Sequence, residues 1–109
     1  MREERGQLAG PLVVHEPLTL WGSVGGDVFV VEGGKFYMRG AIYGNLKVAR
    51  GSKVIHSGTL GGDATNEGGR LYVDATAKIH GKIKTLKGET KIEPVPTIPG
   101  ARRRDERDE

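Results

Sequence analysis

An internal repeat of 18 residues is the feature that most constrains this chain. A seven-residue unit begins at Gly22, at Gly40 and at Gly58, and a fourth copy begins at Ala77 after a step of 19 residues. A second glycine series has the same steps and runs through Gly33, Gly51, Gly69 and Gly88. Two separate series that share one late insertion predict a solenoid, in which each repeat packs only against its neighbours.

Apolar residues indicate the sides of each repeat. They alternate with polar residues, as expected for strands with one buried face. They also recur every six residues, at Val24, Val30, Phe36, Ile42, Val48, Val54 and Leu60. Three steps of six make one repeat, so each turn is expected to have three short sides. The series fails at Asn66, and the insertion is expected between Gly69 and Ala77.

The glycine content disfavours helix and fits a fold with a thin core. The chain has 18 glycines among 109 residues, but only two phenylalanines and one tryptophan. Each glycine in a helix is unfavourable by up to about 1 kcal/mol relative to alanine. We therefore expect an all-β protein, a three-sided β-helix of about four turns over residues 17–93. Residues 1–16 are expected to form a flexible tail or a partial cap, and the Pro-rich, mixed-charge residues 94–109 a disordered tail.

Asp27, Asn45 and Asp63 occupy the same place in three successive repeats. Asp and Asn tolerate the left-handed backbone region better than most residues, and glycine enters it at no steric cost. These three residues and the glycines of the second series are therefore expected to form a structural ladder at the corners. No catalytic role is expected for them.

The composition excludes several kinds of site. The chain has no cysteine, so it forms no disulfide and no thiolate site, which fits a reducing compartment. No apolar run approaches the roughly 20 residues that span a bilayer, so membrane association is not indicated and a cytoplasmic protein is expected. The histidines, His15, His56 and His80, lie at no metal-ligand spacing, and neither a metal nor another cofactor is expected.

Two features suggest other functions. The six-residue period is similar to that of the hexapeptide-repeat acyltransferases, left-handed β-helix trimers in which a histidine acts as the base; His56 or His80 would take that role here. The net charge of +3 resides in the repeats, mostly at Lys78, Lys82, Lys84, Lys87 and Lys91. A solenoid face with these lysines would instead bind a polysaccharide or another anionic polymer, although nucleic acid is not expected.

Two consecutive repeats share one pattern of glycine, apolar and Asp or Asn residues: Gly22-x-Val24-x-Gly26-Asp27-Val28-x-Val30 and Gly40-x-Ile42-x-Gly44-Asn45-Leu46-x-Val48. This pattern resembles the repeat of the bactofilins, the polymer-forming bacterial cytoskeletal proteins, over residues 18 to about 92. The resemblance implies a compact right-handed β-helix that assembles end to end into filaments without nucleotide. We therefore expect a non-enzymatic scaffold whose main partner is itself, with possible protein clients bound through the tails.

The two open ends of a solenoid expose unpaired backbone groups and the interior of the last turn, so self-association is expected there. The candidates at the first end are Leu18, Leu20 and Trp21. The candidates at the other end are Ile83, Leu86 and Ile92. The first end shows no polar cap and is expected to associate more strongly, unless residues 8–16 fold over it. A Leu20→Arg change is expected to disrupt assembly and to leave the β-structure intact.

Overall fold

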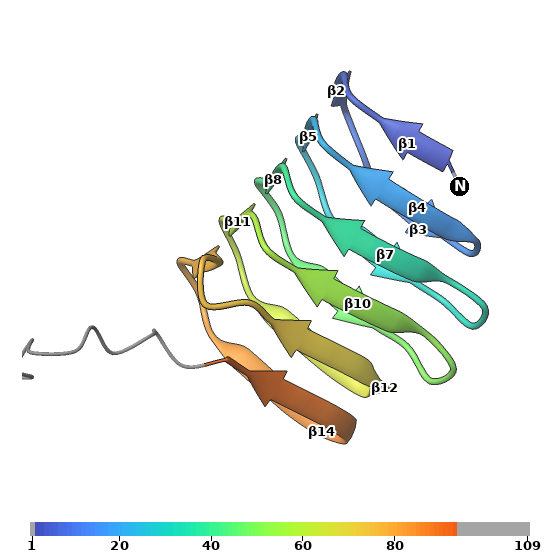
Figure 1. Ribbon diagram of the computed structural model, residues 1–109, viewed down its shortest axis with the longest axis vertical. Coiled ribbons are helices and arrows are strands. Elements are labelled where there is room, and N and C mark those ends of the chain that lie inside the picture. The colour runs from blue at the N-terminus through green and yellow to red at the C-terminus, as the bar shows by residue number, and fades with distance from the viewer. Residues whose placement is uncertain (1, 94–109) are drawn as a thin grey trace, which may run out of the picture.

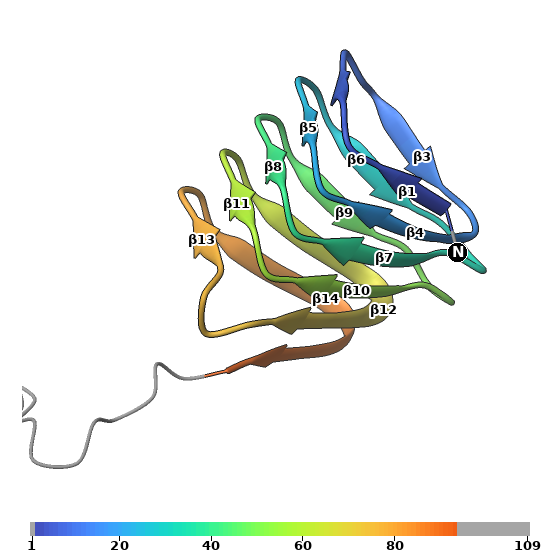
Figure 2. The same cartoon turned by 45° about the horizontal axis from the view of Figure 1, so that its top comes forward.

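The computed structural model describes residues 2–93, which wind into a stack of parallel strands without any helix (Figure 1). Three faces run along the stack (Figure 2). Face A contains β1 (Arg2–Glu4), β4 (Pro17–Leu20), β7 (Lys35–Met38) and β10 (Lys53–His56). Face B contains β2 (Gln7–Leu8), β5 (Ser23–Val24), β8 (Ala41–Ile42), β11 (Thr59–Leu60) and β13 (Lys78–Ile79). Face C contains β3 (Leu12–Val14), β6 (Val28–Val30) and β9 (Leu46–Val48).

Two long strands close the stack. They are β12 (Ala64–Val73) and β14 (Ile83–Ile92), and β12 begins on face C beside β9 and continues onto face A beside β10. β14 follows β12 in parallel over both faces, with register shifts at the corner between them. The last two turns therefore have continuous strands where the earlier turns have separate ones.

The stacked turns are in register, because each strand pairs in parallel with its counterpart in the next turn. On face B the inward residues form one column in steps of 16, 18, 18 and 19 residues. The members of this column are Leu8, Val24, Ile42, Leu60 and Ile79. The three-sided solenoid with an 18-residue repeat is thus confirmed, and it has five turns instead of about four.

Residues 2–16 form the additional turn, so the flexible tail is wrong for this segment, whereas the alternative that residues 8–16 fold over the turn beginning at β4 agrees with the structure. β1, β2 and β3 pair in parallel with β4, β5 and β6. This first turn is two residues shorter than the next, because β3 and β4 are separated by two residues and β6 and β7 by four. An 18-residue period therefore does not reach it. The tail expected at 94–109 lies outside the described residues.

The register also locates the predicted insertion. β10 and β11 are separated by two residues, whereas their partners β12 and β13 are separated by four, at positions 74–77. The preceding corner, inside β12, is one residue shorter than the corner between β9 and β10. The net insertion is one residue and lies in the expected interval.

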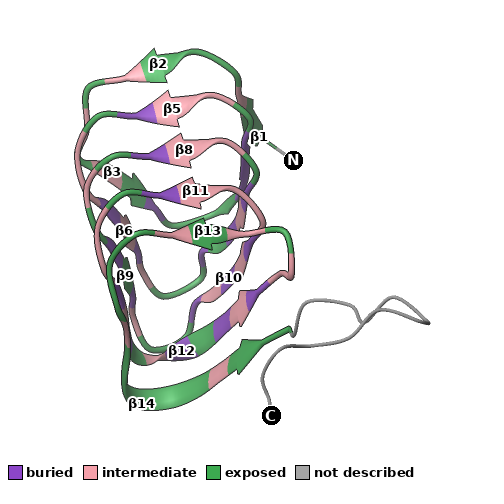
Figure 3. Cartoon of the chain, turned by 90° about the vertical axis from the view of Figure 1, so that its left-hand side faces the viewer, coloured by how far each residue is buried: buried purple, intermediate pink, exposed green. Residues whose placement is uncertain are grey.

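Apolar side chains fill the space between the three faces. Every residue of the six-residue series from Val24 to Leu60 is at most 1% exposed. Figure 3 shows buried residues along the middle turns and exposed ones at the two ends of the stack. Two polar side chains, His56 and Asn66, are also completely buried. Within the described residues there is no helix of the length and hydropathy needed to cross a membrane.

Candidate self-association ends

The corner ladder of Asp27, Asn45 and Asp63 is a set of hydrogen bonds between turns. Asp27 Oδ1 accepts a hydrogen bond from the backbone N–H of Asn45, and Asn45 Oδ1 accepts one from Asp63, each at 2.8 Å. Asp63 Oδ1 accepts the same bond from Lys82 at 2.8 Å. Each side chain thus satisfies a backbone donor in the following turn, which gives the ladder a structural role.

Positive φ angles confirm three of the four glycines predicted at the other corners. Gly33, Gly51 and Gly88 have φ of 87°, 80° and 85°. In the fourth turn the residue with positive φ is Gly68, at 146°, and not the predicted Gly69. This corner is one residue shorter, and Asn66 Oδ1 holds it by accepting hydrogen bonds from the N–H groups of Gly68 and Gly69, at 3.0 and 2.9 Å.

The structural role of Asn66 is one that sequence reasoning missed. Asn66 takes the inward position that Val48 has one turn earlier. Its Nδ2 donates to the carbonyls of Gly69 and Glu89 and contacts the Thr90 hydroxyl, at 3.1, 2.9 and 3.1 Å. Asn66 therefore joins the last turn to the fourth, and the break in the apolar series was the signal for it.

A third glycine column stands at the start of each repeat unit. A Cβ on Gly22 would overlap the carbonyl oxygen of Gly6, and one on Gly40 would overlap that of Gly22. A Cβ on Gly58 would likewise overlap the carbonyl oxygen of Gly40. Ala77 follows in this column, at the corner that two extra residues widen. Glycine is required here because the carbonyl of the preceding turn occupies the space of a side chain.

Gly40→Ala is expected to destabilise the fold by roughly 1–3 kcal/mol, the usual range for overpacking, because the carbonyl of Gly22 cannot move without breaking the stack. Thermal unfolding followed by circular dichroism measures the loss. The matched control is Gly25→Ala, in which the new methyl group would lie no closer than 3.4 Å to any atom. Equal melting temperatures for the two variants would contradict the requirement for glycine in this column.

The first end of the solenoid is not where it was expected. Leu18 and Leu20 lie in the second turn and are 1% and 0% exposed, because β1 pairs with β4 and covers it. Trp21 is 45% exposed at a corner, where the guanidinium groups of Arg5 and Arg39 lie 5.4 and 5.5 Å from its ring centroid. The expectation that these three residues form the end surface is therefore wrong.

Charged residues occupy two inward positions at the actual first end. Arg2 and Glu4 are in register with the inward Leu18 and Leu20. The Arg2 guanidinium lies 3.2 Å from the carboxylates of both Glu16 and Glu4, and hydrogen bonds to them raise the pKa of Arg2. This network is a partial polar cap on face A, while faces B and C end in apolar residues of β2 and β3.

β14 forms the other end of the solenoid, at the opposite end of the stack from β1 (Figure 1). It pairs with β12 along one edge, and within residues 2–93 no strand pairs with its other edge. The predicted residues Ile83, Leu86 and Ile92 all lie on this strand; Leu86 and Ile92 are 67% and 58% exposed. Ile79 and Ile83 are partly buried and pack against the core from this end.

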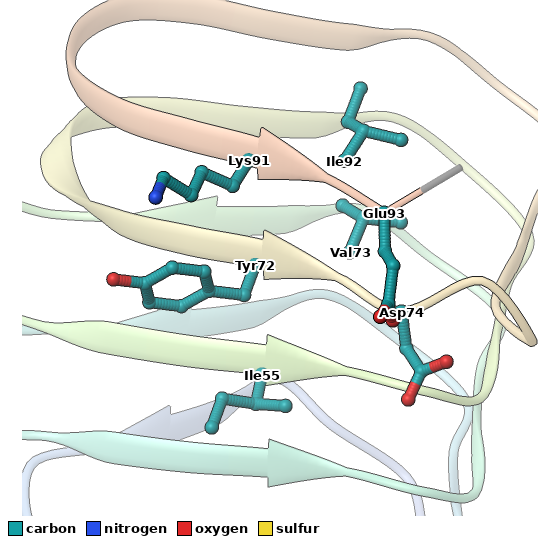
Figure 4. Close-up of a pocket in the computed structure, with 7 residues that line it drawn as sticks. All are labelled: Ile55, Tyr72, Val73, Asp74, Lys91, Ile92 and Glu93. Carbon is teal, nitrogen blue, oxygen red and sulfur yellow. The ribbon is translucent and has the colours of Figure 1, made fainter.

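The outer surface of face A carries a column of cations, and the ring of Tyr72 lies beside it. Lys35, Lys53 and Arg70 are neighbours in successive turns, and the Lys53 ammonium lies 5.6 Å from the centroid of the Tyr72 ring. A cavity of about 430 Å³ opens on the same face at the last turns (Figure 4). Its lining residues are Ile55, Tyr72, Val73, Asp74, Lys91, Ile92 and Glu93.

The lysines predicted to form one binding face do not lie together. Lys78 is on face B, Lys84 on face C and Lys91 on face A, because they follow one another around the last turn. Lys82 and Lys87 lie at or near corners of that turn. The five lysines therefore make the whole last turn basic instead of marking one side of the solenoid.

The histidine geometry gives no support to an acyltransferase site. His56 is completely buried, and neither ring nitrogen has a hydrogen-bond partner among the described residues. Desolvation by burial lowers the pKa of His56. His80 is exposed, at the end of face B. Within residues 2–93, no three His, Asp or Glu side chains are grouped so that they could hold a metal ion.

No family model, curated protein or solved structure matches this chain. The proposed function therefore rests on the geometry of the two ends and the three faces.

Proposed function

We propose that this protein is a non-enzymatic structural scaffold that self-associates through the ends of its solenoid into a nucleotide-independent polymer, in a bactofilin-like cytoskeletal role. The observation that carries the proposal is β14, a ten-residue strand with an outer edge that is unpaired within residues 2–93. An exposed strand edge is a template for pairing with another chain. Solenoids need a cap or a partner at such an end.

The side chains at this end also favour a partner. Ile79, Ile83 and Ile92 continue the apolar columns of the interior and are partly or largely exposed at this end. Fully burying one such side chain stabilises an association by about 1.5–3 kcal/mol. Edge strands are commonly protected by charge, and the lysines of β14 supply charge here only at outward and corner positions. The interior of the last turn therefore exposes Ile79, Ile83 and Ile92, beside Thr85 and Thr90 at the other inward positions.

Negative-stain microscopy and sedimentation velocity of the purified protein without nucleotide test the proposal. Filaments or sheets are the expected result. A discrete trimer, or a monomer at high concentration, would contradict the scaffold role. A trimer would favour the hexapeptide-type alternative, although buried His56 could not reach a substrate.

Ile92→Lys is expected to raise the protein concentration needed for assembly by at least about tenfold, because it places a charge in the apolar contact of the last turn. The fold of the single chain should not change, since the Ile92 side chain is 58% exposed. Sedimentation over a concentration series measures the effect, and circular dichroism checks the fold. Tyr43→Lys, at a corner where the side chain is 68% exposed, is the matched control. Identical assembly of both variants would argue against this end as a contact.

The alternative of a polysaccharide-binding module now points to different residues. The cation column Lys35, Lys53 and Arg70 lies beside the glycine corners of three successive turns, in a groove of about 330 Å³. Tyr37 and Tyr72 lie on the same outer face. Cations beside aromatic rings suit an acidic sugar polymer, so face A, and not the basic last turn, is where such a ligand would bind.

A further inference from the structure

We infer that face A has a second function: its side groove binds a carboxylated polysaccharide that lies along the axis of the solenoid. The groove has a volume of about 330 Å³ and is lined by residues of successive turns. Because it lies on the side of the stack, it stays accessible whether or not the ends of the chain associate. The inference therefore goes beyond the scaffold role and does not depend on it.

The floor of the groove consists of the small residues at the corners before β7, before β10 and inside β12. These corner residues are Gly33, Gly34, Gly51, Ser52, Gly68 and Gly69. Positive φ angles at Gly33, Gly51 and Gly68 favour glycine, so large side chains are absent from this floor for a backbone reason. The same corner geometry recurs in each of these turns, and the hollow therefore extends along the axis.

Three cations form one wall of the groove. Lys35, Lys53 and Arg70 are in register in successive turns, and they point outward because the residue after each of them is buried in the core. None of the three forms an ion pair with a carboxylate among residues 2–93. The groove therefore presents positive charge that the described part of the chain does not pair.

The spacing of these cations favours a polymer with widely spaced negative charges. Paired strands lie about 4.8 Å apart, so the column offers one positive charge over that distance. Duplex DNA has one negative charge per roughly 1.7 Å of its axis, which is a much denser array. Carboxylates also border the column, because the Glu32 side chain lies against Gly51 and Glu89 follows Arg70 in register. A sugar chain with one carboxylate per unit matches this spacing better than a nucleic acid does.

A second outward column lies beside the cations. Tyr37, Ile55 and Tyr72 are in register in successive turns, each two residues after a cation on the same strand. All three side chains are half-buried, so each leaves part of an apolar surface open to solvent. Sugar units have apolar C–H faces and polar edges. The two columns can therefore contact both parts of an acidic sugar chain, with aromatic surface for the faces and cations for the carboxylates.

The neighbouring cavity of about 430 Å³ on face A does not suit the same ligand. Its lining includes two carboxylates, those of Asp74 and Glu93. Figure 4 shows them on the opposite side of the cavity from the Tyr72 hydroxyl and the Lys91 ammonium. An anionic chain is therefore expected to stay on the groove side of face A. There it runs along the axis, because only in that direction do the cations repeat.

Titration calorimetry with galacturonate oligosaccharides of increasing length tests the inference. The affinity should rise from the monosaccharide to the trisaccharide, because each of three turns contributes one cation, and it should fall as salt is added. Equal affinities for the monosaccharide and the trisaccharide, or no binding at any length, would overturn the inference. Tighter binding of a single-stranded DNA of similar length would overturn the assigned class of ligand.

Two triple variants, each with three cations changed to glutamine, locate the site. The groove variant combines Lys35→Gln, Lys53→Gln and Arg70→Gln. The matched control, in the last turn, combines Lys78→Gln, Lys84→Gln and Lys87→Gln. The groove variant should bind polygalacturonate at least about tenfold more weakly than the parent, and the control should stay within about twofold of it. Melting temperatures check that both variants fold.

An equal loss of polygalacturonate binding in the two variants would show that only net charge matters, and it would overturn the groove as the site. The outcome for the scaffold role is separate. Filaments that form without binding polygalacturonate would overturn this inference and leave the scaffold role intact. Binding by a chain that stays monomeric in sedimentation would support the inference and contradict the scaffold role.

Discussion

Leu20→Arg is expected to abolish folding, not merely assembly. Leu20 is 0% exposed between the first and third turns, in contact with the apolar core from which water is excluded. A guanidinium there would be buried, and the carboxylate beside it, that of Glu4, already pairs with Arg2, so the change costs several kcal/mol. The stability of a small domain is typically about 5–15 kcal/mol, so most or all of it would be lost. Circular dichroism and thermal unfolding of the variant measure the effect.

Tyr43→Arg is the control for Leu20→Arg, because Tyr43 is 68% exposed and the new charge would stay in water. We expect its melting temperature to match that of the parent. A Leu20→Arg chain that kept its β-structure and failed only to assemble would show that β1 does not cover β4. That result would mean that the turn containing β4, and not the turn containing β1, forms the first end of the solenoid.

His56→Met is expected to stabilise the protein, and by more at acidic than at alkaline pH. At pH 8 the change removes two buried nitrogen atoms that lack partners, a gain of about 1–3 kcal/mol. Met38 occupies the equivalent position one turn earlier, so a methionine fits this column. Equilibrium denaturation of both chains at a series of pH values measures the difference in the free energy of unfolding.

The pH dependence follows from the lowered pKa of His56 in the folded chain. Above the ordinary pKa of about 6.5, neither the folded nor the unfolded state binds a proton at this residue. As the pH falls through that value, the unfolded chain takes up a proton that the folded chain refuses. Parent stability should therefore decrease by up to roughly 1.4 kcal/mol per pH unit below that value, and His56→Met should lack this part of the decrease. His80→Met controls for the loss of a histidine; equal pH slopes for parent and His56→Met would contradict the buried neutral state.

The ends were harder to predict than the repeats, for a reason visible in particular residues. A repeat is read from recurrence, and the first turn does not recur at 18 residues because its corner before β4 is two residues short. Arg2 and Glu4 also look like solvent-exposed charges, since nothing in the sequence shows that they share the inward register of Leu18 and Leu20. The candidate residues at the last end were easier to predict, because they continue the apolar columns up to Ile92.

The sequence by itself determined the solenoid, its three sides, its 18-residue period and the corner roles of Asp27, Asn45 and Asp63. These properties follow from local periodicity and backbone preferences, and the same pattern occurs in several neighbouring repeats. The tertiary structure decided which turn is the first, which surface is exposed at each end and which glycine bends the fourth corner. Those properties depend on register between turns, and register is a relation between distant residues: the corner beside Asn66 has its positive φ at Gly68, although the glycine spacing predicts Gly69. The repeat therefore predicts how turns stack, and only the tertiary structure shows which residues lie at the two ends of the stack.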